Sequence, residues 1–157
     1  MTDPIEVSKT DCGDMPTDRW NAFLQLLTSA TPDEFTPIQR VAYLAWWYSS
    51  EILNGGHDQY FGNNAVLDQA EVVKALKSLG AMRQSEVLGR AHAVNSRMAE
   101  EMPNDHSELI VWERENKYTG KMADFDQEFY ACEPPIETEL LESFLIHHES
   151  EFIRWAP

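Results

Sequence analysis

Apolar side chains recur every three or four residues along most of the chain, which is the spacing of an α-helix with one buried face. The clearest case begins at Thr36-Pro37, where a hydroxyl can cap a helix and proline suits its first position. Its buried face would comprise Ile38, Val41, Ala45, Tyr48 and Ile52. We expect this helix to end at Asn54-Gly55-Gly56, because glycine readily adopts the left-handed conformation found at helix C-termini.

The same spacing predicts further helices. The first begins at Thr17 or Asp18 and ends at Thr31-Pro32, and the others cover residues 67–79, 82–102, 105–117, 122–131 and 136–153. No stretch alternates long enough to require a strand, and residues 109–112 are the one short ambiguity. The sequence therefore predicts an all-α, irregular single-domain helical bundle of about six to seven helices over residues 17–157, preceded by a polar arm, residues 1–16, with little structure of its own.

Charge limits the classes of partner. The chain has 157 residues with 27 acidic side chains and 12 Lys or Arg, so its formal net charge is −15. This charge argues against direct binding to nucleic acid or to an anionic membrane, because both depend on cationic side chains. The N-terminus lacks a signal-like segment, and the longest apolar run, residues 41–48, is shorter than the ~20 residues of a membrane span. We therefore expect a cytoplasmic protein.

The acidic residues are unevenly distributed. Residues 122–153 contain nine acids and no Lys or Arg, and residues 100–115 contain six acids and one base. Acidic runs of this kind usually form a solvated surface, with Arg and Lys of the same chain as ion-pair partners. The alternative is that they form an acidic face that binds a cationic partner. Arg83, Arg90 and Arg97 form a stripe that can pair with acids within the chain or across a two-fold interface. The acids nominated for partner binding are Glu100, Glu101, Asp105, Glu108, Asp124, Asp126 and Glu128.

The most distinctive segment follows the Thr36 helix and predicts a tight structural turn, with a binding pocket as the alternative. Asn54, Gly55 and Gly56 would reverse the chain, and Tyr60 and Phe61 would bury their rings beneath the turn. The amides of Gln59 and Asn63 would satisfy the backbone groups that a tight turn leaves unpaired. Further along the chain, Gly80, which is followed by Ala81, closes the helix predicted over residues 67–79.

These segments resemble a family of small acidic bacterial proteins named for a member characterised as a DNA mimic. The family's signature reads Glu-Val-x-Asn-Gly-Gly-Phe-x-Gln-Phe-Phe-x-Asn, followed by a helix that ends in Gly-Ala. Residues 126–130 and the segment 144–152 also resemble the family's C-terminal half. His57 stands where the family usually has Phe, and Ala65-Val66 replaces a common glycine. The resemblance implies a dimeric, acid-faced protein that binds a DNA-binding protein in place of DNA.

Candidate chemical sites are few. His147 and His148 are adjacent, so on a helix their rings point ~100° apart and cannot share a metal. No phosphate-binding glycine loop, hydrolase elbow or zinc signature occurs in the sequence, and we expect no metal and no cofactor. Cys12 and Cys132 are expected to be reduced thiols, with a disulfide that tethers the N-terminal segment as the alternative.

The sequence leaves three hypotheses. The first is a non-enzymatic DNA-mimic protein that binds a basic DNA-binding protein, such as a transcriptional regulator, and forms a homodimer as the resemblance implies. The second is another protein–protein module, such as a toxin-neutralising immunity protein. The third is an enzyme at the Asn54-Gly55-Gly56 turn that uses His57 and Asp58 as an acid–base pair.

Overall fold

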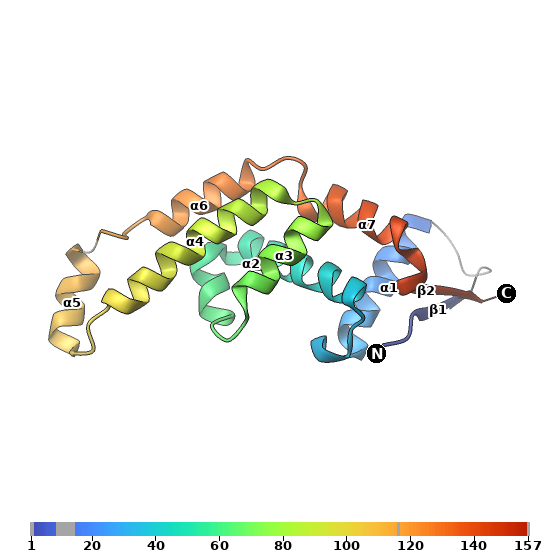
Figure 1. Cartoon of the computed structure of the whole chain (residues 1–157), viewed down its shortest axis with the longest axis horizontal. Helices are drawn as coiled ribbons and strands as arrows, with labels where there is room; N and C mark the ends of the chain where they lie inside the picture. Colours follow the sequence, from blue (N-terminus) through green and yellow to red (C-terminus); the bar gives the residue numbers. More distant parts are fainter. Residues whose placement is uncertain (1, 9–14, 116, 157) are drawn as a thin grey trace.

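The computed structural model describes residues 2–8, 15–115 and 117–156, and these form a bundle of helices with one small sheet (Figure 1). The α-helices are α1 (Met15–Ser29), α2 (Pro37–Asn63), α3 (Gln69–Leu79), α4 (Met82–Glu101), α5 (His106–Glu115), α6 (Lys121–Tyr130) and α7 (Glu142–His147). Shorter turns of helix are η2 (Pro32–Glu34), the π-helix η3 (Ile136–Leu141) and η4 (Glu149–Glu151). The predicted all-α, irregular single-domain bundle is confirmed.

The centre of the molecule is formed by α2, α3, α4 and α6. Helix α2 packs against α3 and α6, and α4 packs against the same two helices. Their shared core contains the fully buried side chains of Tyr48, Ile52, Tyr60, Leu76 and Leu88. Figure 1 shows α1, α7 and both termini at one end of the bundle and α5 at the opposite end, beyond the last turn of α4. We call the end that carries α5 the distal end.

Two short strands join the ends of the chain, which the sequence did not predict. Strand β1 (Ile5–Ser8) pairs in parallel with β2 (Ile153–Ala156), with Ile5 opposite Ile153. The arm of residues 1–16 therefore has structure where it is described, and the single helix predicted over residues 136–153 is wrong. Four-residue strands are too short to produce a periodic signal, and each one is ordered by the other.

Capping side chains set the other helix ends largely as predicted. Thr36 and Gln39 form a capping box at the start of α2, and Asp68 caps α3, which ends at Gly80 in the left-handed conformation. Helix α1 begins at Met15, two residues before the predicted start. Cys132 is a free, buried thiol, and Cys12 lies outside the described residues.

Candidate functional site

The Asn-Gly-Gly segment lies at a kink that divides α2 into two helical segments. Gly56 alone has non-helical dihedral angles there (φ 74°, ψ −174°), and the helix resumes at His57. The predicted break with positive φ at a glycine is therefore confirmed at Gly56, whereas the predicted chain reversal is wrong, because a second helical segment follows at once. The amide N–H of His57 donates to the Asp126 carboxylate on α6 at 2.8 Å, so a side chain from another helix supplies the acceptor that the kink removes. We call Gly56, His57, Tyr48 and Asp126 the kink junction.

Both glycines are required by their surroundings. A Cβ atom on Gly56 would lie 2.4 Å from Asp126 Oδ2, and the positive φ of this residue already disfavours any other side chain. A Cβ on Gly55 would lie 2.1 Å from Oε1 of Gln59. Asn54 is exposed and helical, so it has no part in a turn. Gly56 therefore allows α6 to come close to α2, whereas the contact of Gly55 lies within α2.

The remaining residues of the segment are partly as predicted. Tyr60 and Phe61 are buried, and the Tyr60 hydroxyl donates to Gln69 at 2.7 Å. The amides of Gln59 and Asn63 were expected to satisfy backbone groups, and this is wrong: both donate to the Glu51 carboxylate at 2.9 Å. Glu51 precedes the kink and the amides follow it, so this carboxylate connects the two halves of α2.

The His57 ring completes the kink junction. Its Nδ1 lies 2.6 Å from Asp126 Oδ1 and its Nε2 lies 3.0 Å from the Tyr48 hydroxyl. Burial lowers the pKa of His57 despite the opposing influence of Asp126, so the ring is neutral at pH 7. A neutral ring that donates from Nδ1 and accepts at Nε2 satisfies both contacts.

This arrangement does not support the acid–base pair suggested by the sequence. The partner of His57 is Asp126 and not its neighbour Asp58. The rings of His57 and Tyr48 are fully buried, so a substrate reaches neither of them while the kink stays closed. The contacts of these residues are those of a structural network that holds α2 against α6.

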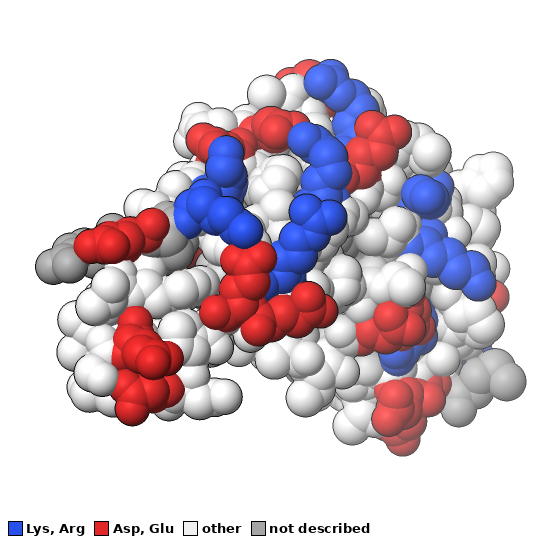
Figure 2. All heavy atoms as spheres, turned by 60° about the vertical axis from the view of Figure 1, so that its left-hand side comes forward, with Lys and Arg blue, Asp and Glu red and all other residues white. Residues whose placement is uncertain are grey.

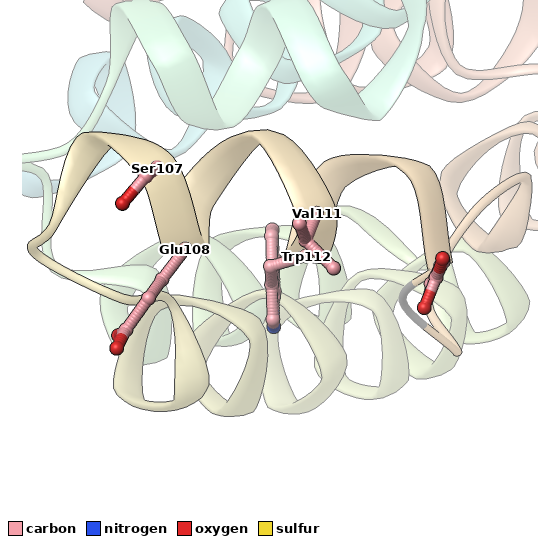
Figure 3. Close-up of a pocket in the computed structure, with 5 residues that line it drawn as sticks. Ser107, Glu108, Val111 and Trp112 are labelled. Carbon is pink, nitrogen blue, oxygen red and sulfur yellow. The ribbon is translucent and has the colours of Figure 1, made fainter.

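The distal end is a different kind of surface. One side of α5 lines an open pocket of about 470 Å³, with apolar Val111 and Trp112 between polar and acidic residues (Figure 3). Ile110 and Val111 are exposed to 56% and 47%. Sequence reasoning did not nominate this apolar surface, although the signal was present in the ambiguous apolar run of residues 109–112. The pocket also includes Ser107, Glu108 and Glu115.

The seven nominated acids fall into two groups. Glu100, Glu101, Asp105 and Glu108 lie at the distal end, whereas Asp124, Asp126 and Glu128 lie on α6. Asp105 accepts from the amides of Ser107 and Glu108, so it caps α5 and remains exposed. Its hydrogen bonds, first that from the Ser107 hydroxyl, lower the pKa of Asp105. Asp105 is therefore ionised at neutral pH.

Cations of the chain itself accompany several of these acids. Lys117 pairs with Glu101 at 3.0 Å, Lys121 lies 3.9 Å from Asp124, and Arg90 pairs with Glu128. Asp126 is held in the kink junction, with 20% of its side chain exposed. Figure 2, with the distal end brought forward, shows Lys and Arg among Asp and Glu on this face. Among the described residues, three of the seven acids have neither a Lys or Arg partner nor the His57 contact of Asp126: Glu100, Asp105 and Glu108.

The arginine stripe meets acids inside the chain at its centre. Arg90 on α4 donates two hydrogen bonds to Glu128 on α6, and its guanidinium lies 5.5 Å from the centre of the Phe125 ring. Both partners are about half exposed. This pair connects α4 to α6, so Arg90 and Glu128 need no second copy of the chain to meet.

The described residues contain neither a metal-binding cluster nor a membrane-spanning helix. Among them, no three His, Cys, Asp or Glu side chains come together as a metal ion requires. Of the helices described, none combines the length and the apolar character needed to cross a membrane.

The fold and the distal end together define an acidic all-α protein that presents carboxylates beside an apolar pocket. Residues 33–148 match the model of the DMP19-like protein family, a span of about three quarters of the chain. The chain therefore belongs to the DMP19-like protein family. No curated protein and no solved structure matches it.

Proposed function

We propose that this protein is a non-enzymatic DNA mimic, whose distal end binds a basic DNA-binding protein in place of DNA. The observation that carries the proposal is the group of exposed, unpaired carboxylates on Glu100, Asp105 and Glu108, next to the α5 pocket. The family that the sequence resembles is named for a member characterised as a DNA mimic, and that resemblance favours the same role here. A transcriptional regulator is the partner class that fits best.

The overall charge supports this role. The chain has 27 acids for 12 Lys or Arg, so 15 acids stay unmatched even if every base forms an ion pair. A surplus of this size attracts a cationic protein over a distance of about one Debye length, ~8 Å at physiological salt. Fixed carboxylates then pair with Arg and Lys that would otherwise contact phosphates.

The apolar pocket adds a preference for arginine. The guanidinium of a partner arginine can pair with Glu108 while its stem lies against Val111 and its plane stacks on Trp112. A lysine ammonium gains less from the same surface, because it is a strongly hydrated point charge without a planar face. We therefore expect the contact region of the partner to be rich in arginine.

The experiment is affinity purification from an extract of the source cells, followed by competition. The immobilised protein captures its partner, and DNA that carries the partner's binding site is then added at low salt. A mimic occupies the DNA-binding groove, so the DNA should displace the partner from the column. A captured protein that does not bind DNA, or a complex that DNA cannot displace, would reject the proposal.

Two matched variants locate the contact. The first is Glu100→Gln/Asp105→Asn/Glu108→Gln, in which asparagine keeps the α5 cap. The control, Glu133→Gln/Glu139→Gln/Glu142→Gln, removes the same number of exposed charges elsewhere. Capture should be lost only with the first variant. Equal loss with both variants would indicate attraction by net charge alone.

The immunity-protein hypothesis gives a different outcome of the same experiment. The exposed apolar residues Ile110 and Val111 favour it, because DNA presents no such patch to a partner. Under this hypothesis the captured protein is an enzyme, the complex blocks its active site, and DNA does not compete. Assay of the captured protein with and without the immobilised chain distinguishes the two.

A further inference from the structure

A groove lies at the opposite side of the core from the distal end, between the start of α2, helix α3 and α7. It encloses about 540 Å³, and its apolar lining includes Phe35, Val41, Leu44 and Phe144. A second hollow of about 260 Å³ shares Ser78, Phe144 and His148 with it, so the two adjoin. Small-molecule sites typically enclose about 300–1,000 Å³ and are mostly apolar.

The charge of this groove is opposite to that of the molecule. Among the described residues that line it, the ionisable groups are Arg40, Lys74, His147, His148 and a single acid, Glu71. Arg40 donates two hydrogen bonds to Glu71, and the hydrogen bond lowers the pKa of that carboxyl, so the acid is already neutralised by a cation. Arg40 also lies 3.8 Å from the exposed Asp33, which is outside the lining, so among the lining residues Lys74 is the cation without a hydrogen-bonded acid.

Three polar side chains in the groove have no hydrogen-bond partner in the described part of the chain. They are the Lys74 ammonium, the Ser78 hydroxyl and the His148 ring, and Lys74 and Ser78 come from neighbouring turns of α3. The His148 ring lies 4.5 Å from the Phe144 ring, so a polar group and an apolar surface occur side by side. Arg40 already directs three of its five N–H donors at Glu71 and the Pro32 carbonyl, so we assign the head group to Lys74 and not to Arg40.

We propose that this groove binds a small amphipathic carboxylate. The apolar body lies on Val41, Leu44 and Phe144, and the carboxylate accepts hydrogen bonds from Lys74 and Ser78, with His148 beside it. A cationic amphiphile is rejected, since its head group would meet Lys74 without a free acid to pair with. The site shares no residue with the α5 pocket, so it stands whether or not the distal end binds a DNA-binding protein.

Calorimetric titration with decanoate, below its micelle concentration, tests the proposal. Decanoate should bind the full chain at one site, and decyltrimethylammonium, which has the same tail and the opposite charge, should not. Lys74→Gln should weaken decanoate binding about tenfold, because a charge-assisted hydrogen bond to the head group is lost. Ser78→Leu should abolish binding, because it removes a donor and fills the groove.

The control variant is Lys77→Gln, which removes the same charge from the same helix at an exposed position outside the groove lining. It should bind decanoate as the wild type does. Equal weakening by Lys77→Gln and Lys74→Gln, equal binding of the cationic amphiphile, or no decanoate binding to the wild type would each overturn the proposal. Circular dichroism of each variant shows whether the fold is retained, and a variant that fails to fold is replaced by Lys74→Met.

Discussion

Asp126 in the kink junction and Glu108 at the distal end come from equally acidic parts of the sequence, yet the fold uses them in opposite ways. The Asp126 carboxylate accepts hydrogen bonds from the His57 amide and lies 2.6 Å from the His57 ring. Glu108 is exposed at the edge of an apolar pocket. Asp126 is structural because it faces a break in another helix, whereas an exposed carboxylate such as that of Glu108 remains available to a partner.

This difference determines where a substitution acts. Changes in the kink junction affect the free energy of unfolding, because they leave buried polar groups of α2 without partners. Changes at the distal end alter exposed groups, which contribute little to folding and much to association. The predictions below separate the two regions on this basis.

The largest effect is expected for Gly56→Ala. Gly56 combines a positive φ with an extended ψ of −174°, a region essentially restricted to glycine that costs another residue about 1–3 kcal/mol, and the clash with Asp126 adds about 1–2 kcal/mol. The loss of unfolding free energy should therefore be about 2–5 kcal/mol, measured by urea denaturation. Gly62→Ala is the control, because its Cβ meets no atom within 4 Å. That helical position should gain up to about 1 kcal/mol. Similar losses in both variants would show that the kink is not specifically required.

Asp126→Ala should have the next largest effect. This change removes the acceptor of the His57 amide and the partner of the His57 ring. A hydrogen bond to a charged group contributes about 1.5–3 kcal/mol. We expect a loss of about 2–3 kcal/mol. Asp124→Ala on the same helix, with 71% of the side chain exposed, should change stability by less than about 0.5 kcal/mol. Equal effects at the two positions would contradict the structural role of Asp126.

Local signals predicted what local interactions determine. The Thr36 hydroxyl caps α2 and Gly80 closes α3, both as predicted. At Gly56 the same reasoning was only partly right. The break itself is present, but the second segment of α2 follows without a turn, and its His57 amide donates to a carboxylate 69 residues further along the chain. No local pattern reports such a partner.

The distal end shows the same limit. Clustering of acids between residues 100 and 128 is visible in the sequence, but the cations that pair with them depend on packing. Lys117 reaches Glu101 because the chain turns back after α5, and Arg90 reaches Glu128 because α4 and α6 lie side by side. The sequence identified the acidic region, and the fold selects which of its carboxylates remain free.

The pH dependence of the unfolding free energy should also distinguish the kink junction from the distal end, with a smaller effect than the two substitutions above. Unfolded His57 binds a proton near pH 6.5, whereas burial lowers the pKa in the folded protein. The unfolded state therefore holds more protons between the two pKa values, and stability falls as the pH decreases from 7.5 to 5.5. The slope from one group is at most about 1.4 kcal/mol per pH unit.

His57→Phe, which keeps an aromatic ring and removes the titrating group, should remove that slope, as followed by urea denaturation at a series of pH values. His106→Phe at the distal end is the matched control, because this residue is exposed at the start of α5. The control should keep the slope of the wild type. A slope that persists in His57→Phe would assign the titration to another group. Acids with lowered pKa, such as Glu71, act at a lower pH and do not interfere.

The smallest effect on stability is expected for Lys117→Met. Side chains of the Lys117–Glu101 pair are 68% and 45% exposed, so its loss should leave the midpoint of urea unfolding unchanged. The same change frees the Glu101 carboxylate at the distal end, so affinity for the captured basic partner should rise by about two- to threefold, chiefly through faster association at low salt. Lys77→Met removes an equal charge on α3, far from this end, and should leave the association rate much closer to that of the wild type. A lower affinity of Lys117→Met would mean that Lys117 itself contacts the partner, and that the distal end is recognised as a mixed-charge protein surface rather than as a substitute for DNA.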